Sequence, residues 1–248
     1  MAEALVPMGA PAALELLVEG SIWRLERPLP LFSRPQGAGL ATEAGPGRVL
    51  QLLQERQAGR RRVRLLEDGY PGWIEPAGLL GNGSAAERPR PLLLDRPAIE
   101  RRLAQVLAFA EAARQRPNTY LWGGRVGPDY DCSGFVQAAF ASAGIWLPRD
   151  AYLQERFCGA VAVGPGQHQL LRPGDLIFFG PAQRCTHVGL HLGQGQYLHS
   201  SGREHGRNGL GIDDLNPHNQ DPVASHYLRQ LRGAGRVLRC HDGSALPA

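Results

Sequence analysis

The sequence predicts a small all-β barrel followed by a larger α+β domain whose helices pack on an antiparallel sheet. Short strand-like segments separated by turn residues fill residues 21–80, and closely spaced short strands are typical of a barrel. Two helical patterns then precede a run of strand patterns, an order typical of α+β proteins rather than of alternating βαβ folds. A chain of 248 residues is long enough for both domains.

A segment rich in Gly, Ser, Asn and Pro separates the two parts. Residues 81–95 read GNGSAAERPRPLLLD, a composition typical of a linker between domains. We therefore expect a barrel over residues 15–80, a linker over 81–95 and the second domain over 96–242.

The second domain begins with two predicted helices. In the first, over 97–116, Asp95 is the expected cap, and one face collects Ile99, Leu103, Val106, Leu107 and Ala110. In the second, over 132–144, apolar residues recur with helical spacing until Gly144 ends the helix. Strands are then predicted at 175–180, 187–193, 196–200 and 235–240.

The formal net charge is +4, and part of it lies in a run of arginines within the predicted barrel. Arg60, Arg61, Arg62 and Arg64 predict a solvated strand face. A nucleic-acid surface is the alternative, but no motif supports it, and we expect no nucleic-acid partner. An acidic substrate or polymer is compatible with this charge.

Four cysteines could form two disulfides, but no small, cysteine-dense framework is visible, and a chain of this length can build a core without disulfides. Cys185, His187 and His191 resemble part of a metal site, but a closed four-ligand spacing is missing, so we expect neither a metal nor a cofactor. Residues 1–20 carry acidic rather than basic residues, and no apolar run has the ~18 residues of a membrane helix. We therefore expect no membrane partner and a cytoplasmic location.

Cys132 stands in PDYDCSGFV, at the predicted start of the second helix, between an aspartate and a serine. A helix N-terminus stabilises an anion, so this position is expected to lower the pKa of the thiol without burying a charge. A nucleophile also needs a base. His187 and His199 lie on two strands that can pair as a hairpin around LGQGQ, which would bring His199 beside the His187 ring.

These motifs together resemble one family. The series YLWGG, DCSGFVQAAF, GIWLPRDA, GDLIFF, THVGLHLG and YLHSSG is similar to the NlpC-type cell-wall cysteine peptidases, a papain-like group. The whole resemblance covers roughly residues 20–242 in the same order. It most resembles the γ-D-glutamyl-L-diamino acid endopeptidases that carry an N-terminal bacterial Src-homology-3-like barrel. The resemblance implies a papain-like catalytic domain behind an SH3-like barrel.

The resemblance also implies catalytic roles. Cys132 would be the nucleophile, His187 the base, His199 the third polar residue and Tyr120 the active-site tyrosine. The backbone N–H of Cys132 and the Tyr120 hydroxyl are suited to stabilise an oxyanion, and the His187 imidazolium is suited to protonate the leaving amine.

The implied substrate is a murein stem peptide with a free N-terminal L-alanine, cut between D-glutamate and the diamino acid during peptidoglycan recycling. Tyr70, Asp131 and Ser133 would line its pocket, with Arg149 and Asp150 nearby. Alternatively, Asp131 is a helix cap and Tyr70 an ordinary barrel aromatic. If Asp131 binds the ammonium group, a blocked amine would leave this carboxylate buried and unpaired.

Two other functions are compatible with this pattern. The first is an acyltransferase on a papain-like core, which uses the same thioester with an acceptor other than water. The second is a non-catalytic murein-binding module, which the intact set of Cys132, His187 and His199 disfavours.

Overall fold

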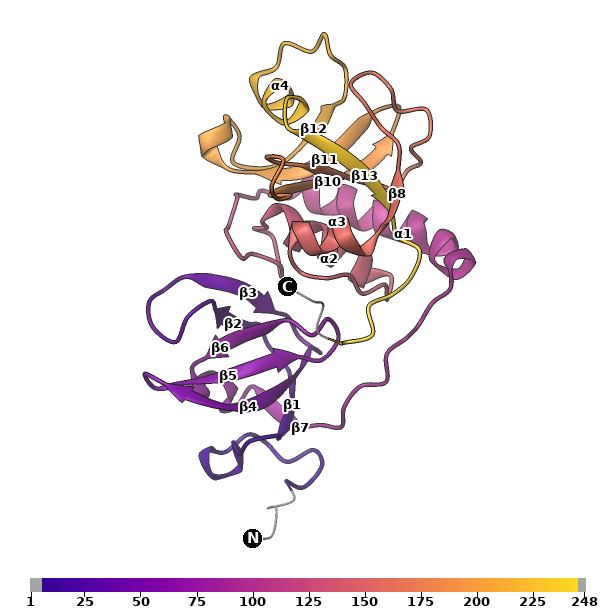
Figure 1. Ribbon diagram of the computed structural model, residues 1–248. Helices are drawn as coiled ribbons and strands as arrows, with labels where there is room; N and C mark the ends of the chain where they lie inside the picture. Colours follow the sequence, from indigo (N-terminus) through magenta and orange to yellow (C-terminus); the bar gives the residue numbers. More distant parts are fainter. Residues whose placement is uncertain (1–5, 245–248) are drawn as a thin grey trace. The chain divides into compact units, whose positions relative to one another are not determined.

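Figure 1 shows the computed structural model, in which residues 6–244 are described. The described chain forms two compact units: residues 6–91 together with 242–244, and residues 92–241. No helix among these residues is long and apolar enough to cross a membrane. All four cysteines are free.

The N-terminal unit is the predicted all-β barrel. Its sheet is antiparallel throughout, in the order β3-β2-β6-β5-β4-β1-β7. The strands are β1 (Ile22–Leu25), β2 (Leu29–Phe32), β3 (Leu40–Ala44), β4 (Val49–Gln57), β5 (Arg60–Leu65), β6 (Pro71–Ile74) and β7 (Gly83–Ala85). Short 3-10 helices span Leu14–Leu16 and Pro76–Leu79. Alternate strand residues fill the core, with Trp23, Leu50 and Val63 fully buried.

The barrel extends beyond its predicted end at residue 80. Strand β7 lies inside the predicted linker 81–95 and pairs with β1 at the edge of the sheet. A three-residue strand rich in Gly and Ser has no apolar alternation, so its composition resembles a linker. At the other end, Asp242 belongs with the barrel rather than with the second unit. The carbonyl oxygen of Ser244 approaches Gly69 so closely that a Cβ on Gly69 would lie 2.5 Å from it.

The arginine run on β5 is only partly the solvated face that its sequence predicts. Arg61 is 6% exposed, and its Nη1 donates to the carbonyl oxygen of Leu17 at 2.8 Å. The guanidinium of Arg60 stacks 3.6 Å over the Phe32 ring. Strand alternation explains the difference, because successive side chains point to opposite faces and Arg61 therefore faces inward.

The second unit combines helices with an antiparallel sheet in the order β12-β11-β10-β9-β13-β8. Its helices are α1 (Arg96–Arg114), α2 (Cys132–Ser142), α3 (Ala151–Phe157) and α4 (Pro222–Leu228). Its strands are β8 (Gly159–Val161), β9 (Leu176–Phe179), β10 (His187–Gly193), β11 (Gln196–Ser201), β12 (Gly209–Asp214) and β13 (Leu231–Arg236), and a 3-10 helix spans Arg203–His205.

The two predicted helices of this unit are confirmed. Asp95 caps α1, its side chain accepting from the Ala98 N–H at 2.9 Å. Helix α2 ends just before Gly144, whose φ of +74° suits the left-handed turn that follows a helix.

The central strands bury both of their faces. Leu176 and Phe178 of β9 pack with α1, α2 and α3, whereas Ile177 and Phe179 pack with Val223 and Tyr227 of α4. Figure 1 shows α2 and α4 on opposite sides of this sheet. The continuous apolar run LIFF therefore reflects a strand that is covered on both faces.

The last strand lies earlier in the chain than predicted. Residues 235–240 look strand-like, but β13 covers Leu231–Arg236 and pairs with β9 and β8. A Cβ on Gly235 would lie 2.5 Å from the Cys158 Cβ and 3.1 Å from the Phe178 ring. Strand β13 therefore contains glycine because neighbouring residues pack closely against its backbone, although glycine does not favour a strand.

Candidate active site

Cys132 is the first residue of α2, as the sequence predicts. Asp131 occupies the cap position, and its Oδ1 accepts from the Gly134 N–H at 2.6 Å. Gly134 lets the helix approach the preceding loop, because a Cβ there would collide with the Gly124 carbonyl oxygen. The DCSG sequence thus seats the start of α2 directly against the loop that carries Gly123 and Gly124.

The Asp131 carboxylate is already fully paired. Its Oδ1 also accepts from Arg149 Nη1 at 3.0 Å and from Ser133 Oγ at 3.3 Å. Its Oδ2 accepts from the Gly123 N–H at 2.8 Å and from Arg149 Nη2 at 2.6 Å. Asp131 is therefore a helix cap and an ion-pair partner. The expectation that a blocked substrate amine would leave this carboxylate unpaired is wrong, because Arg149 neutralises it without substrate.

The thiol of Cys132 is buried, with 6% of the residue exposed. Burial, and next the charge of Asp131, raise the pKa of this thiol to about 12. The N–H groups of Val188 and Ser133 and the Arg149 guanidinium act in the opposite direction. The expected lowering of this pKa by the helix start is therefore wrong, since desolvation of a thiolate outweighs the helix-terminus effect here. Cys132 rests as a neutral thiol.

The two predicted histidines lie together at the start of the β10–β11 hairpin. Strands β10 and β11 pair antiparallel, and His187 Nε2 lies 2.7 Å from His199 Nδ1. Val188, the next residue on β10, donates its N–H to the Cys132 sulfur, which places the thiol beside the start of this strand. Burial, and next the neighbouring His199, hold the pKa of His187 well below 6.5. His187 is therefore a neutral ring that is able to accept a proton.

Two further side chains complete the surroundings of these rings. The Tyr227 ring of α4 stacks on His187 with the centroids 4.1 Å apart, and its hydroxyl lies 2.8 Å from Ser201 Oγ. On the far side, Asp213 Oδ2 lies 2.7 Å from His199 Nε2. The sequence offers little signal for either residue. Asp213 stands in GIDDL, where two adjacent aspartates lie between two apolar residues. This short pattern alone does not indicate a buried site residue.

Tyr120 lies close enough to Cys132 for their charges to interact. Burial, and next the Cys132 thiolate charge, raise the pKa of the Tyr120 phenol, so the phenol keeps its proton and is able to donate it. The Tyr120 N–H donates to Asn208 Oδ1 at 3.3 Å, which ties the loop before α2 to the loop before β12. This position is compatible with the predicted oxyanion role.

The predicted substrate residues fall into two groups. Asp131, Ser133 and Arg149 form one buried cluster at the start of α2, in which Arg149 Nη1 donates to Ser133 Oγ at 2.9 Å. Asp150 is the cap residue of α3. Tyr70 belongs to the barrel, where its ring packs against the core and its N–H donates to Asp68 Oδ1 at 3.2 Å. The substrate roles of Tyr70 and Asp150 stay predictions.

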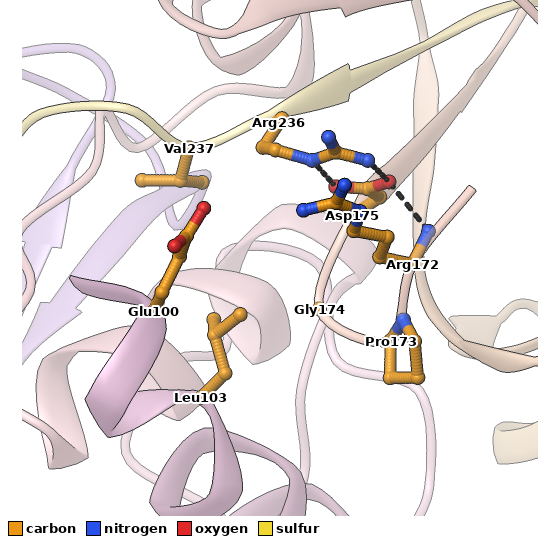
Figure 2. A pocket seen from close by; sticks show the side chains of 8 residues that line it. All are labelled: Glu100, Leu103, Arg172, Pro173, Gly174, Asp175, Arg236 and Val237. Carbon is orange, nitrogen blue, oxygen red and sulfur yellow. Dashed lines mark hydrogen bonds and ion pairs between the residues drawn. The ribbon is translucent and has the colours of Figure 1, made fainter. Parts of the chain in front are cut away.

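A hollow of about 270 Å³ lies elsewhere on the second unit (Figure 2). There, Arg236 donates two hydrogen bonds to Asp175, at 2.8 and 2.7 Å. None of the predicted site residues lines it; its lining comprises Glu100, Leu103, Arg172, Pro173, Gly174, Asp175, Arg236 and Val237. Among residues 6–244, no group of three His, Cys, Asp or Glu side chains is placed to hold a metal ion.

Comparison with known proteins finds a family match within each unit. Residues 117–232 match the NlpC/P60 family, and residues 31–79 match the bacterial dipeptidyl-peptidase SH3 domain. The chain is 33% identical over 129 residues to the probable endopeptidase p60 of Listeria monocytogenes, covering 52% of this chain and 23% of that protein. It is 40% identical over 122 residues to the γ-D-glutamyl-L-lysine dipeptidyl-peptidase of Bacillus cereus, covering 48% and 32%.

The curated relatives are longer proteins, of whose length the matched part covers between 21% and 32%. Among solved structures, an NlpC/P60 family protein from Bacillus cereus aligns with a TM-score of 0.44 at 26% identity, covering 89% of this chain and 64% of that one.

The depressed pKa of His187 leads to a prediction about pH. A base must be unprotonated, so we expect the acid limb of kcat/KM to have its midpoint below pH 6.5, the ordinary histidine value. Stability changes over a different window. Because unfolded histidines take up protons that buried His187 and His199 resist, stability should fall as the pH drops below 6.5.

The measurement is the pH profile of kcat/KM, with near-ultraviolet circular dichroism at each pH to keep unfolding apart from titration. An acid limb centred at or above pH 6.5 would contradict this account of His187.

The Asp131–Arg149 pair leads to a second prediction. Arg149→Met removes the guanidinium and leaves a buried carboxylate with fewer donors, which should lower the free energy of unfolding by about 3–5 kcal/mol. Urea unfolding followed by circular dichroism measures this loss. Arg156→Met on the exposed face of α3 is the matched control and should lower the free energy of unfolding far less. Equal losses in the two variants would show that the pair does not hold the start of α2.

Proposed function

We propose that this chain, whose residues 117–232 match the NlpC/P60 family and whose residues 31–79 match a bacterial SH3 domain, is a cysteine endopeptidase. Its proposed reaction is hydrolysis of the γ-D-glutamyl–diamino acid bond of murein stem peptides. The main support for this proposal is one buried cluster of side chains. In it, the Cys132 sulfur of α2 lies beside the start of β10, and His187 contacts His199. The names of the Bacillus relatives support the choice of bond.

We propose the following chemistry for these residues. The Cys132 sulfur attacks the amide carbonyl while its proton passes to His187, because a thiol with a pKa of about 12 does not ionise by itself at neutral pH. A carbon–sulfur bond forms, and the Tyr120 hydroxyl donates to the oxyanion. The carbon–nitrogen bond then breaks as the His187 imidazolium returns the proton to the leaving amine.

Water completes the cycle. It attacks the thioester carbonyl, and His187 takes one of its protons. The carbon–sulfur bond breaks, the γ-D-glutamyl acid is released, and the proton returns to the sulfur. An acyltransferase would use another acceptor at this step, so the ratio of hydrolysis to transfer in the presence of amines separates the two functions.

The direct test is incubation of the purified protein with L-Ala-γ-D-Glu-diaminopimelate and with the corresponding lysine peptide, followed by mass spectrometry. We expect the dipeptide L-Ala-γ-D-Glu and the free diamino acid. Cys132→Ala should reduce the rate to background, because it removes the sulfur that is proposed to attack the amide carbonyl. Cys158→Ala and Cys240→Ala are the matched controls and should keep wild-type rates. Unchanged turnover in Cys132→Ala would refute the proposal, and no cleavage by the wild type would favour a binding module.

The finer proposal is that the enzyme prefers peptides with a free N-terminal L-alanine, which are already released from the wall. The description of the barrel's family and the dipeptidyl-peptidase names of the relatives support it. Since Asp131 is already paired with Arg149, Asp131→Asn would disturb the fold and is a poor probe. Tyr70 is the better residue with which to test recognition of the substrate amine.

The recycling role and the cytoplasmic location belong to this proposal, and cell fractionation tests the location.

We therefore expect the wild type to cleave the N-acetylated tripeptide about ten- to a hundredfold more slowly than the free one, the range of one hydrogen bond to a charged group. Tyr70→Phe should narrow this ratio, because it removes the hydroxyl that is proposed to accept from the ammonium. Tyr152→Phe is the control. The measurement is kcat/KM for both peptides in each variant. Equal rates in the wild type would exclude recognition of the free amine and leave a broader murein hydrolase.

A further inference from the structure

A buried acidic side chain ends the line of histidines. Asp213 lies on β12, which pairs with β11, and it is 6% exposed. Its Oδ2 lies 2.7 Å from His199 Nε2, and the other ring nitrogen of His199 lies 2.7 Å from His187 Nε2. The three side chains therefore form one hydrogen-bonded line that ends at His187. Asp213 is not among the residues implied by the resemblance to the peptidase family.

The chemistry of the carboxylate gives this line a direction. An ionised carboxylate only accepts hydrogen bonds, so His199 Nε2 must carry a proton and donate it to Asp213. A neutral imidazole has one N–H, so His199 Nδ1 is bare and accepts. His187 Nε2 must then carry the proton of the second bond, which leaves His187 Nδ1 bare.

We propose that Asp213 is a positioning residue that sets the tautomers of both histidines, so that the bare Nδ1 of His187 is the atom that takes the thiol proton. The catalytic part of this inference rests on the proposed function, whereas the tautomers themselves do not. The histidines are neutral in the folded protein, because burial lowers the pKa of each below 6.5.

Arg207 keeps Asp213 ionised and oriented. Its Nη2 donates to Asp213 Oδ1 at 2.7 Å, so each carboxylate oxygen has a donor. Burial raises the pKa of Asp213, but the bonds from His199 and Arg207 outweigh burial and hold this pKa below 3.8. Gly211 provides the space for this arrangement. It faces His199 in the register of β11 and β12, and a Cβ there would collide with Arg207 Nη1.

The alternative is that Asp213 and Arg207 form a structural ion pair with no effect on the rings. Both readings predict some loss of stability when Asp213 is changed, so stability does not separate them. The protonation state of each ring nitrogen does separate them, because a structural ion pair has no need to fix which nitrogen carries the proton.

The primary experiment is nitrogen-15 NMR of the wild-type protein with labelled histidine at neutral pH, since chemical shifts distinguish protonated from bare ring nitrogens. His187→Gln and His199→Gln assign the signals. We expect Nε2–H and bare Nδ1 for both residues. A proton on Nδ1 of either ring in the wild type overturns the proposal before any variant of Asp213 is made.

Asp213→Asn is the perturbing variant, because an amide both donates and accepts and so no longer forces one direction on the line. We expect mixed tautomers for His199 and His187, and a fall in kcat with little change in KM. When an acidic residue contacts the catalytic base directly, its loss leaves the base in the wrong tautomer and lowers kcat by up to about 10⁴-fold. Asp213 acts through a second ring, so we expect about a ten- to a thousandfold loss here.

Two further variants make the test specific. Asp214→Asn on the neighbouring residue of β12 is the matched control and should leave both the tautomers and kcat unchanged. Gly211→Ala displaces Arg207 while keeping Asp213, and its kcat should lie between those of the wild type and Asp213→Asn. A fall in kcat in Asp213→Asn without any change of tautomer would show that Asp213 is structural only.

Failure of this inference is distinct from failure of the proposed function. If the wild type cleaves no γ-D-glutamyl peptide, the proposed activity fails, and the NMR signals still decide whether Asp213 sets the tautomers. If the peptide is cleaved but the Asp213→Asn protein keeps wild-type kcat and wild-type tautomers, the activity stands and the inference is overturned.

Discussion

The carboxylate of Asp131 ties together three segments of the second unit, and the position of the candidate nucleophile depends on it. It caps α2, accepts from the Gly123 N–H in the preceding loop, and pairs with Arg149 before α3. Each partner alone is an ordinary interaction, but together they satisfy a charge that is almost fully removed from water. Removing any one of them leaves that charge less well compensated, which is why the start of α2 is so closely determined.

Desolvation is the second constraint on the chemistry of the site. The Cys132 sulfur and both histidine rings are buried, so the charged forms that catalysis needs are costly in the resting protein. A neutral thiol beside a neutral imidazole avoids that cost until a substrate carbonyl arrives. The proposed proton transfer during attack follows from this, since it creates charge only as the oxyanion and its donors form. The line from His187 through His199 to Asp213 is suited to stabilise the imidazolium at that moment.

Several elements of the fold were predictable because their local sequence patterns agree with their tertiary packing. Helix α2 has an aspartate cap, an apolar stripe and a terminal glycine, and its bounds follow from them. Strand β10 and strand β11 follow from their composition and from the turn between them. Where packing disagrees with composition, prediction failed. Strand β7 resembles a linker, and β13 contains glycines because neighbouring side chains leave no room for a Cβ.

The sequence by itself determined which residues carry the candidate chemistry: a cysteine at a helix start, two histidines on one hairpin and a tyrosine in the preceding loop. Only the tertiary structure decided their electrostatics. It buried Cys132 and so raised the pKa of its thiol, paired Asp131 with Arg149, and brought Asp213 and Tyr227 to the histidines. The reason is physical: helix and hairpin signals act over a few neighbouring residues, whereas pKa values and ion pairs depend on burial and on charges from distant parts of the chain.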